Sequence, residues 1–383
     1  MKHRLGKKRL LFGLAFLILL YSFWLGTQLL RFSPQRTNVT PEKSPPHEIV
    51  GVYHIHTTFS DGLSSPDKIA RIAARQGLDF IILTDHGKPN LRCLESQGWK
   101  DGLLLLAGSE LSVSRGHLVA LDFAPPRRPF SQNAEDAARE IRANGGFSVI
   151  AHPFSKVRWS WGEEVEYAGL EIIDADTMFK KNLLPSLPYL PALLFKPGFY
   201  LLKTLERPVQ TLRKWDELNE THVLYGYFSA DAHLFYRVIL SGFHLHVLLD
   251  APLSAEFDTA RSQVFGALRQ GRFYSAVNAA GNAAGFRFWA EGSGSRFPMG
   301  SVIPLTSASS LELHVLAPFS SAVETRFIHN GKTIRSAAEK ETSVVAQEPG
   351  TYRVEAYLRE WSPLTSDIPW IVSNPIFLRK DEK

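Results

Sequence analysis

The chain has 383 residues, which is enough for two or three domains and a substantial buried core. Hydrophobic residues make up 44% and charged residues 21%, a balance that excludes a disordered or fibrous chain. The single cysteine, Cys93, excludes an intramolecular disulfide framework and a cysteine-rich zinc module. The formal net charge of +5 comes from five basic residues among the first nine, and the rest of the chain is balanced. The charge distribution therefore gives no indication of a nucleic-acid partner.

A long apolar segment follows the basic residues 1–9. Residues 10–30 contain no charged side chain, and a helix of that length crosses a hydrocarbon core of about 30 Å. The preceding basic residues favour a cytoplasmic N-terminus, which predicts a single-pass membrane anchor with an extracytoplasmic, periplasmic-type body. A cleaved signal peptide is the alternative, but the apolar run is longer than usual and no small-residue cleavage site follows it. Residues 31–47 are polar and proline-rich and predict an extended linker.

Apolar runs alternate with amphipathic helical stretches from residue 48 to residue 285. Helical periodicity ending in glycine predicts helices at 65–77 and 133–146. Near-continuous apolar runs separated by helices are typical of a parallel sheet buried on both faces, and seven of them favour an α/β barrel. The seven predicted strands are 49–56, 79–86, 103–111, 117–123, 147–152, 169–175 and 223–233.

The pattern changes from residue 286 to residue 383. Segments 311–317, 325–330 and 351–359 alternate apolar and polar residues. This alternation predicts a small all-β sandwich of antiparallel strands with one face in water.

Histidines and carboxylates follow the predicted strands of the body repeatedly. His54 and His56 end the first strand, and at positions i and i+2 both rings point to the same face. In a parallel barrel such strand ends meet at one rim, where catalytic groups collect. Polar capping of strand ends is the alternative. A second pair, His244 and His246, has no carboxylate-containing turn beside it and is interpreted as structural. The other residues at strand ends are Asp85, His86, Glu110, His117, His152, Asp231 and His233.

These motifs resemble those of the PHP domain family, named after its polymerase and histidinol phosphatase members. The similar motifs are H-x-H-x-x-x-S-D-G at 54–62, T-D-H at 84–86, G-S-E at 108–110, A-H-P at 151–153 and A-D-A-H at 230–233. The resemblance implies a distorted (β/α)₇ barrel with two or three divalent metal ions at its C-terminal rim. The implied ligands are His54, His56, Asp61, His86, Glu110, His117, His152, Asp231 and His233.

The resemblance also implies individual roles. Glu110 is similar to the family's bridging carboxylate, and Asp85 resembles a residue that orients a neighbouring ligand. The C-terminal sandwich, with residues 349–377, looks like the branch that includes carbaryl hydrolase.

Six imidazoles and three carboxylates suit Zn²⁺, Mn²⁺ or Fe²⁺. Such ions lower the pKa of a bound water, so we expect a metal-bridging hydroxide near Glu110, with His152 or His233 protonating the leaving group. Filled with divalent ions, the centre carries more positive charge than its three carboxylates neutralise, which favours an anionic small molecule as substrate. The sequence therefore predicts a membrane-anchored phosphoesterase. Hydrolysis of a carbamate, amide or ester on the same centre is one alternative. A non-catalytic, tethered metal-binding or sensory module is another.

Residues 183–205 are strongly apolar but interrupted by four prolines, which argues against a second membrane-spanning helix. Two interpretations remain open. The segment folds as short helices that cover the barrel mouth as a lid, or its apolar face rests on the bilayer.

Overall fold

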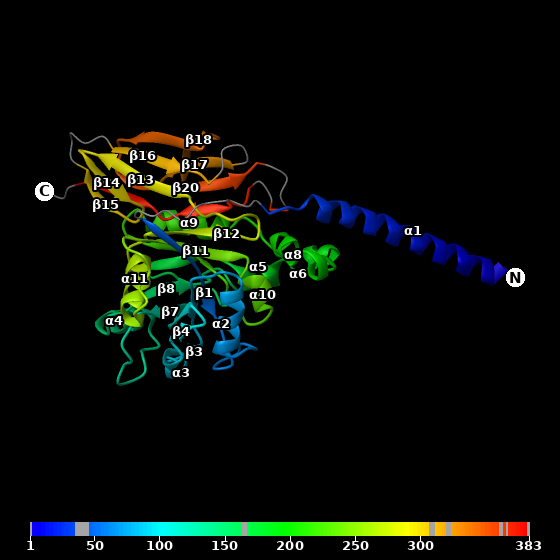
Figure 1. Ribbon diagram of the computed structural model, residues 1–383, viewed down its shortest axis with the longest axis horizontal. Coiled ribbons are helices and arrows are strands. Elements are labelled where there is room, and N and C mark those ends of the chain that lie inside the picture. Colours follow the sequence, from blue (N-terminus) through cyan, green and yellow to red (C-terminus); the bar gives the residue numbers. More distant parts are fainter. Residues whose placement is uncertain are drawn as a thin grey trace.

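The computed structural model describes residues 2–34, 46–162, 167–305, 311–318, 323–359, 363–364 and 367–380. It shows a mixed α/β body, a β-rich C-terminal part packed on that body, and a long N-terminal helix that projects away from both (Figure 1).

Helix α1 (Lys2–Arg31) contains the expected membrane anchor. Its segment Leu10–Arg31 has a mean hydropathy of 2.0, and only 6% of its most apolar window is buried against the rest of the chain. Among the described residues, one helix is long enough and apolar enough to cross a membrane, and it is α1. Residues 35–45, most of the expected linker, lie outside the described residues, as do the side chains of residues 1–9.

Strands form at all seven predicted positions of the body, and two of the predicted strands are divided by a turn. Residues 79–86 form β2 and β3, and residues 103–111 form β5 and β6. The second division lies at Gly108, where a Cβ atom would come within 2.3 Å of the carbonyl oxygen of Ala120. The body strands are β1 (His47–Ile55), β2 (Phe80–Leu83), β3 (His86–Gly87), β4 (Gly98–Lys100), β5 (Leu103–Ala107), β6 (Ser109–Val113), β7 (Gly116–Leu121), β8 (Phe147–Ala151), β9 (Gly169–Asp174), β10 (Tyr225–Ser229), β11 (Phe243–Leu249) and β12 (Phe273–Val277).

Helices connect these strands and cover the sheets. Both predicted helices are present, as α2 and α4, and each begins and ends within two or three residues of the predicted bounds. The body helices are α2 (Pro66–Arg75), α3 (Leu91–Glu95), α4 (Ala134–Ala143), α5 (Ala175–Lys181), α9 (Val209–Leu218), α10 (Tyr236–Ile239) and α11 (Phe257–Arg269).

The body strands belong to two sheets, and the pairing is only partly parallel. Strands β1, β2 and β5 run parallel, as do β8, β9 and β10. The expectation of a wholly parallel sheet was wrong for β7, which is antiparallel to β6 and β8, and β11, which was not predicted as a strand, is antiparallel to β1. For β6 and β7 the reason is the two-residue connection at 114–115, since only antiparallel strands can be joined by so short a turn.

Backbone hydrogen bonds join the two sheets at both margins. The amide of Ala230, just after β10, donates to the carbonyl oxygen of Tyr53 in β1 at 3.0 Å. At the other margin the amide of Glu110 in β6 donates to the carbonyl oxygen of Thr84, just after β2, at 3.0 Å. The ends of β1, β2, β8 and β10 are therefore held close to one another, which positions the residues that follow them.

The C-terminal part contains a four-stranded sheet and an extension of the first body sheet. The four-stranded sheet consists of β13 (Arg287–Gly292), β14 (Ser295–Pro298), β16 (Leu311–Leu316) and β19 (Glu341–Ala346). The extension consists of β15 (Val302–Leu305), β17 (Val323–His329), β18 (Lys332–Ala337), β20 (Gly350–Leu358), β21 (Ile371–Ser373) and β22 (Ile376–Lys380). It is continuous with the body because β21 pairs with β12.

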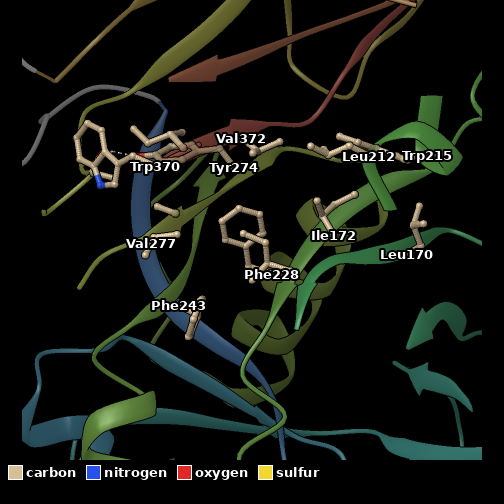
Figure 2. Close-up of a cluster of buried hydrophobic side chains, with 14 of the residues drawn as sticks. Leu170, Ile172, Leu212, Trp215, Phe228, Phe243, Tyr274, Val277, Trp370 and Val372 are labelled. Atoms are coloured by element: carbon tan, nitrogen blue, oxygen red, sulfur yellow. Dashed lines mark hydrogen bonds between the residues drawn. The ribbon is translucent and has the colours of Figure 1, made fainter. Parts of the chain in front are cut away.

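The expected wet face is present on β16, where buried residues alternate with exposed or half-buried ones, but not on β20, where seven consecutive residues are buried. The reason is that the second face of β20 packs against α9 of the body. Arg353 of β20 forms ion pairs with Asp216 of α9 and with Glu355. Figure 2 shows the adjoining core, in which Val372 from the C-terminal part lies beside Tyr274 of the body, while Trp370 and Trp215 lie at opposite ends of the cluster.

Candidate metal centre

All nine predicted ligand residues lie together at strand ends of the body. Their nitrogen and oxygen atoms form groups in which all atoms lie within 4.8 Å of one another. Three of these groups account for the nine residues: His54, His56, Glu110 and Asp231; then Glu110, His117 and His152; then His56, Asp61, His86 and His233.

The first group is fully buried. Nε2 of His56 lies 3.1 Å from Oδ1 of Asp231 and 3.2 Å from Oε2 of Glu110. Nε2 of His54 lies 3.2 Å from the same Glu110 oxygen and 3.1 Å from Nε2 of His56. Two ligands bound at about 2.1 Å to one ion lie about 3.0–3.4 Å apart at tetrahedral or octahedral angles. The spacing of this group therefore fits a single ion.

The second group uses the other oxygen of Glu110. Oε1 of Glu110 lies 2.9 Å from Nδ1 of His117 and 2.9 Å from Nε2 of His152. The two ring nitrogens are 3.4 Å apart. Each oxygen of Glu110 thus faces a different group, which is the geometry that a bridging carboxylate requires.

The third group is looser and open to solvent. Oδ2 of Asp61 lies 3.3 Å from Nε2 of His233 and 3.7 Å from Nε2 of His86, while Oδ1 lies 3.5 Å from Nδ1 of His56. The Asp61 side chain is 53% exposed, whereas those of Glu110 and His56 are almost completely buried. A substrate can therefore reach the centre from this side.

The nitrogen and oxygen atoms of the buried group are better satisfied by a divalent cation than by hydrogen bonds among themselves. Oδ1 of Asp231 is buried, and it faces only the imidazole nitrogens of His56 at 3.1 Å and His54 at 3.4 Å, with His233 at 3.7 Å, among the described residues. Nε2 of His54 and Nε2 of His56 face each other in the interior, and two neutral rings can share at most one hydrogen bond there. A buried polar atom without a partner costs free energy, and a bound cation would satisfy all of these lone pairs at once.

The electrostatics of the group confirm strong coupling between the acids and the imidazoles. Burial alone would raise the pKa of Glu110, but the charge of His54 and hydrogen bonds from His117 and His152 hold it well below its ordinary value. Burial lowers the pKa of His56, but hydrogen bonds to Asp231 and Glu110 outweigh it and raise the pKa to about 9. Likewise, contacts with Glu110 and nearby acids raise the pKa of His152 to about 10 against its burial. Metal ions therefore compete with protons at these rings.

Three of the ligand residues have backbone conformations that side chains rarely adopt. His54, His152 and Asp231 have φ angles of 66°, 26° and 41°. Each lies at or just after the end of a strand, where the left-handed turn redirects the chain. Such conformations cost about 1–3 kcal/mol each and are retained where the surrounding structure requires them.

Sequence reasoning missed Glu171, which supports two ligands from within β9. Its Oε1 lies 2.6 Å from Nδ1 of His54, and its Oε2 accepts a hydrogen bond of 2.7 Å from the backbone amide of His152. Glu171 is buried, and its contact fixes the His54 ring so that Nε2 points to the centre. The one signal in the sequence that could have identified Glu171 is that a charged residue stands in the middle of a predicted apolar strand.

Asp85 lies beside the centre and makes its contacts outside the three groups. Its carboxylate accepts hydrogen bonds from the amide and hydroxyl of Thr57, both at 2.8 Å, and from the hydroxyl of Ser60 at 2.6 Å. These bonds hold the turn that separates His56 from Asp61.

A fourth group, Asp176, Asp231 and His233, was not anticipated. Asp176 belongs to the first turn of α5 and is half-buried. Nearby, burial and the charge of Asp231 raise the pKa of Asp174 to about 7. Acidic groups therefore continue from the centre toward α5.

A cavity of about 450 Å³ opens beside His152 and Glu171. Residues of α5 form one wall. Residues 206–211, which follow the apolar segment with four prolines at 183–205, form another. Its charged lining includes Lys181, which pairs with Glu206, and Arg207, which contacts Glu355 of the C-terminal part.

The second His-x-His pair is structural, as interpreted from the sequence. Nδ1 of His246 lies 2.8 Å from Glu48, and its Nε2 lies 3.2 Å from Asn278. Nε2 of His244 donates to the carbonyl oxygen of Leu240 at 2.8 Å, and burial lowers the pKa of His244 to about 3. Each ring therefore has at least one protein partner, Glu48 and Asn278 for His246 and Leu240 for His244.

No protein-family model matches the chain. Among curated proteins, the chain is 25% identical over 140 residues to an uncharacterized protein of Methanocaldococcus jannaschii, which covers 32% of this chain and 80% of that one. It is 33% identical over 97 residues to a 5'-3' exoribonuclease of Haemophilus influenzae, which covers 24% of this chain and 35% of that one. The chain thus matches about a third of the exoribonuclease.

Among solved structures, the chain is similar to a two-domain protein from Bacteroides vulgatus that contains a predicted PHP-like metal-dependent phosphoesterase. The TM-score is 0.43 and the identity 14%, over 90% of this chain and 99% of that one. A protein from Bifidobacterium adolescentis, provisionally named a metal-dependent phosphoesterase, has a TM-score of 0.34 and 14% identity over 51% of this chain and 90% of that one. The description of the first of these structures names the PHP family that the motifs of this chain resemble. The carbaryl hydrolase branch stays a prediction.

Proposed function

We propose that the protein is a metal-dependent hydrolase of phosphoesters, held at a membrane by α1. The observation that carries the proposal is the position of Glu110, whose two oxygens each contact a separate pair of histidines at 2.9–3.2 Å. A carboxylate shared in this way is suited to hold two ions a few ångströms apart, the arrangement that two-metal hydrolytic sites use.

Divalent ions in these groups would lower the pKa of water so that hydroxide is available near neutral pH, and would neutralise charge on the reacting group. Three ions and three ligand carboxylates leave a net positive charge, which favours an anionic substrate such as a phosphoester. The ion identities proposed from the ligand set are Zn²⁺, Mn²⁺ or Fe²⁺.

The protein's own residues then orient the substrate and move protons. Because His152 lines the cavity, it is the candidate to protonate the leaving group of a substrate bound there. His233, in the open group with Asp61, is the candidate for a substrate that enters over that side.

The arrangement of the whole chain belongs to the same proposal. The two joined sheets form the distorted barrel of residues 48–285, and residues 286–383 form an accessory sandwich. Residues 1–9 stay in the cytoplasm, residues 10–30 cross the membrane, and the linker at 31–47 leads to an extracytoplasmic body.

The test uses purified full-length protein in detergent, reconstituted with Zn²⁺, Mn²⁺ or Fe²⁺. It is assayed on phosphomonoesters, phosphodiesters including a short RNA, and a panel of carbamates, amides and aryl esters. We expect metal-dependent phosphoester cleavage that is lost in Glu110→Gln and His54→Ala and kept in His222→Ala, a histidine bonded to Thr221 and Leu218. Cleavage of carbamates, amides or esters alone would establish the alternative chemistry. Tight metal binding without turnover on any panel would establish a binding module.

A further inference from the structure

Residues 183–203, the helical part of the apolar segment with four prolines, are called the proline-rich segment below. They fold as four short helices beside the C-terminal end of α1 (Figure 1). They are α6 (Leu183–Ser186), η1 (Leu187–Tyr189), α7 (Ala192–Phe195) and α8 (Pro197–Lys203). The inner side of α8 belongs to the core, where Phe199, Leu201 and Leu202 are buried. The segment is thus fixed to the body, although its residues do not line the cavity beside His152.

The outer side of the proline-rich segment is apolar and uncovered. Leu184 is 76% exposed, Leu194 is 83% exposed and Phe195 is 73% exposed. Leu183, Leu187 and Leu190 of this segment are exposed as well. Large apolar side chains exposed together in one short segment indicate a contact surface, because leaving them in water is unfavourable.

Helix α1 contacts this segment well before it ends. The hydroxyl of Tyr21 donates to the carbonyl oxygen of Pro188 at 2.6 Å, and the ring of Trp24 lies 5.5 Å from that of Tyr189. Leu25 of α1 is buried by the body. Because α1 rises by about 1.5 Å per residue, the contact at Tyr21 lies about 15 Å along the helix from Arg31.

The length of α1 makes this contact informative. Arg9 and Arg31 bound the uncharged run of residues 10–30, which is about 30 Å long and just matches the thickness of a hydrocarbon core. The span cannot end at Tyr21, since the residues from Leu10 to Tyr21 cover only about 17 Å. A span that fills the hydrocarbon core would therefore include the part of α1 between Tyr21 and Leu30, and the residues packed against that part would lie at the level of the lipid.

We propose that the proline-rich segment is a second membrane-contact surface, with Leu184, Leu194 and Phe195 inserted into the bilayer that α1 crosses. The proposal rests on the proposed membrane span but not on the proposed chemistry. The hydrogen bond from Tyr21 to Pro188 satisfies polar groups at a level where water is scarce. Lys196 donates to the carbonyl oxygen of Phe32 at 2.6 Å, so its ammonium lies where α1 ends and the chain leaves the lipid.

This surface has a consequence for the cavity. Helix α5 lines the cavity and leads directly into α6, so insertion of the segment holds the cavity entrance near the bilayer surface. Lys180 and Lys181 lie at the end of α5, between the cavity and the proline-rich segment. Both side chains are largely exposed and can face lipid headgroups.

The test places a fluorescent label on the full-length chain in vesicles of phosphatidylcholine and phosphatidylglycerol. Single cysteines are introduced as Leu17→Cys in α1, Leu194→Cys in α7 and Val345→Cys in β19, all at exposed positions. The native Cys93 is buried and stays unlabelled, which the unmodified chain verifies. Quenching is measured with a nitroxide on the lipid acyl chains and with aqueous iodide.

We expect lipid nitroxide to quench the labels at positions 17 and 194 strongly and iodide to quench them weakly, with the reverse at position 345. The proposal is overturned if position 194 behaves like position 345 while position 17 is in lipid. It is equally overturned if position 194 is shielded from both quenchers, which would indicate a second copy or another part of the chain on this face. A label at position 17 that iodide reaches would remove the span on which the proposal rests. None of these outcomes depends on hydrolytic activity, so the proposed function stands or falls separately.

Discussion

Replacing Glu171 by glutamine tests whether support from behind the ligands determines metal affinity. Glu171 receives two short hydrogen bonds, 2.6 Å from the His54 ring and 2.7 Å from the His152 amide, and it is buried. Glutamine has the same shape but only one acceptor oxygen, so one of the two donors would face its amide NH₂ group. A buried donor without an acceptor costs about 1–3 kcal/mol. Since each 1.4 kcal/mol is a factor of ten, metal affinity should fall roughly 5- to 150-fold.

The measurement is a competition titration of Zn²⁺ or Mn²⁺ against a chromogenic chelator, with the full-length protein in detergent. Glu206→Gln is the matched control, because Glu206 lines the same cavity but pairs with the exposed Lys181 and not with a ligand. We expect Glu206→Gln to bind metal like the unmodified protein. The reasoning is refuted if Glu171→Gln keeps full affinity while His54→Ala loses it, or if both glutamine variants lose affinity equally.

Three further predictions follow from burial and charge. Metal binding should release protons and strengthen as the pH rises toward 9, because neighbouring acids raise the pKa of His56 to about 9 and of His152 to about 10 against their burial. Calorimetry in buffers of different ionisation enthalpy counts these protons, and binding without proton release contradicts the prediction. Although burial opposes it, His246 and Arg287 lower the pKa of Glu48 from 4.5 to about 2, so its carboxylate stabilises the fold above pH 4.5 and this stability is lost as the pH falls toward 2. Glu48→Gln should therefore lower the free energy of unfolding by up to roughly 3 kcal/mol at pH 7 and by much less near pH 2, as urea titrations at both pH values would show. Phe228→Ala should destabilise the core of Figure 2 by about 3–5 kcal/mol, whereas Phe235→Ala, at an exposed position, should stay within about 1 kcal/mol; equal effects in urea unfolding would contradict the packing argument.

Local patterns in the sequence predicted much of the secondary structure and all nine clustered residues. Apolar runs predicted strands at seven positions of the body because a buried strand must be apolar on both faces, whatever its neighbours, although β4, β11 and β12 were not predicted. The clustered residues could be predicted because each lies at or near a strand end and forms part of a short motif, as with His54 and His56.

Strand direction and the supporting residues depended on the tertiary structure. The two residues at 114–115 force β6 and β7 to be antiparallel, yet an apolar run looks the same in either direction. Glu171 carries no motif, and it matters only because β9 lies beside β8 and brings its carboxylate to His54.

The sequence by itself determined which segments are apolar, which residues can bind a cation, and that one helix is long enough to cross a membrane. These properties depend on the residues of one segment at a time. Only the tertiary structure decided that Glu110 faces two pairs of histidines, that both faces of β20 are buried, and that Tyr21 meets Pro188. The physical reason is that each of these contacts joins residues distant in the chain, and their distance is set by the packing of whole sheets and helices.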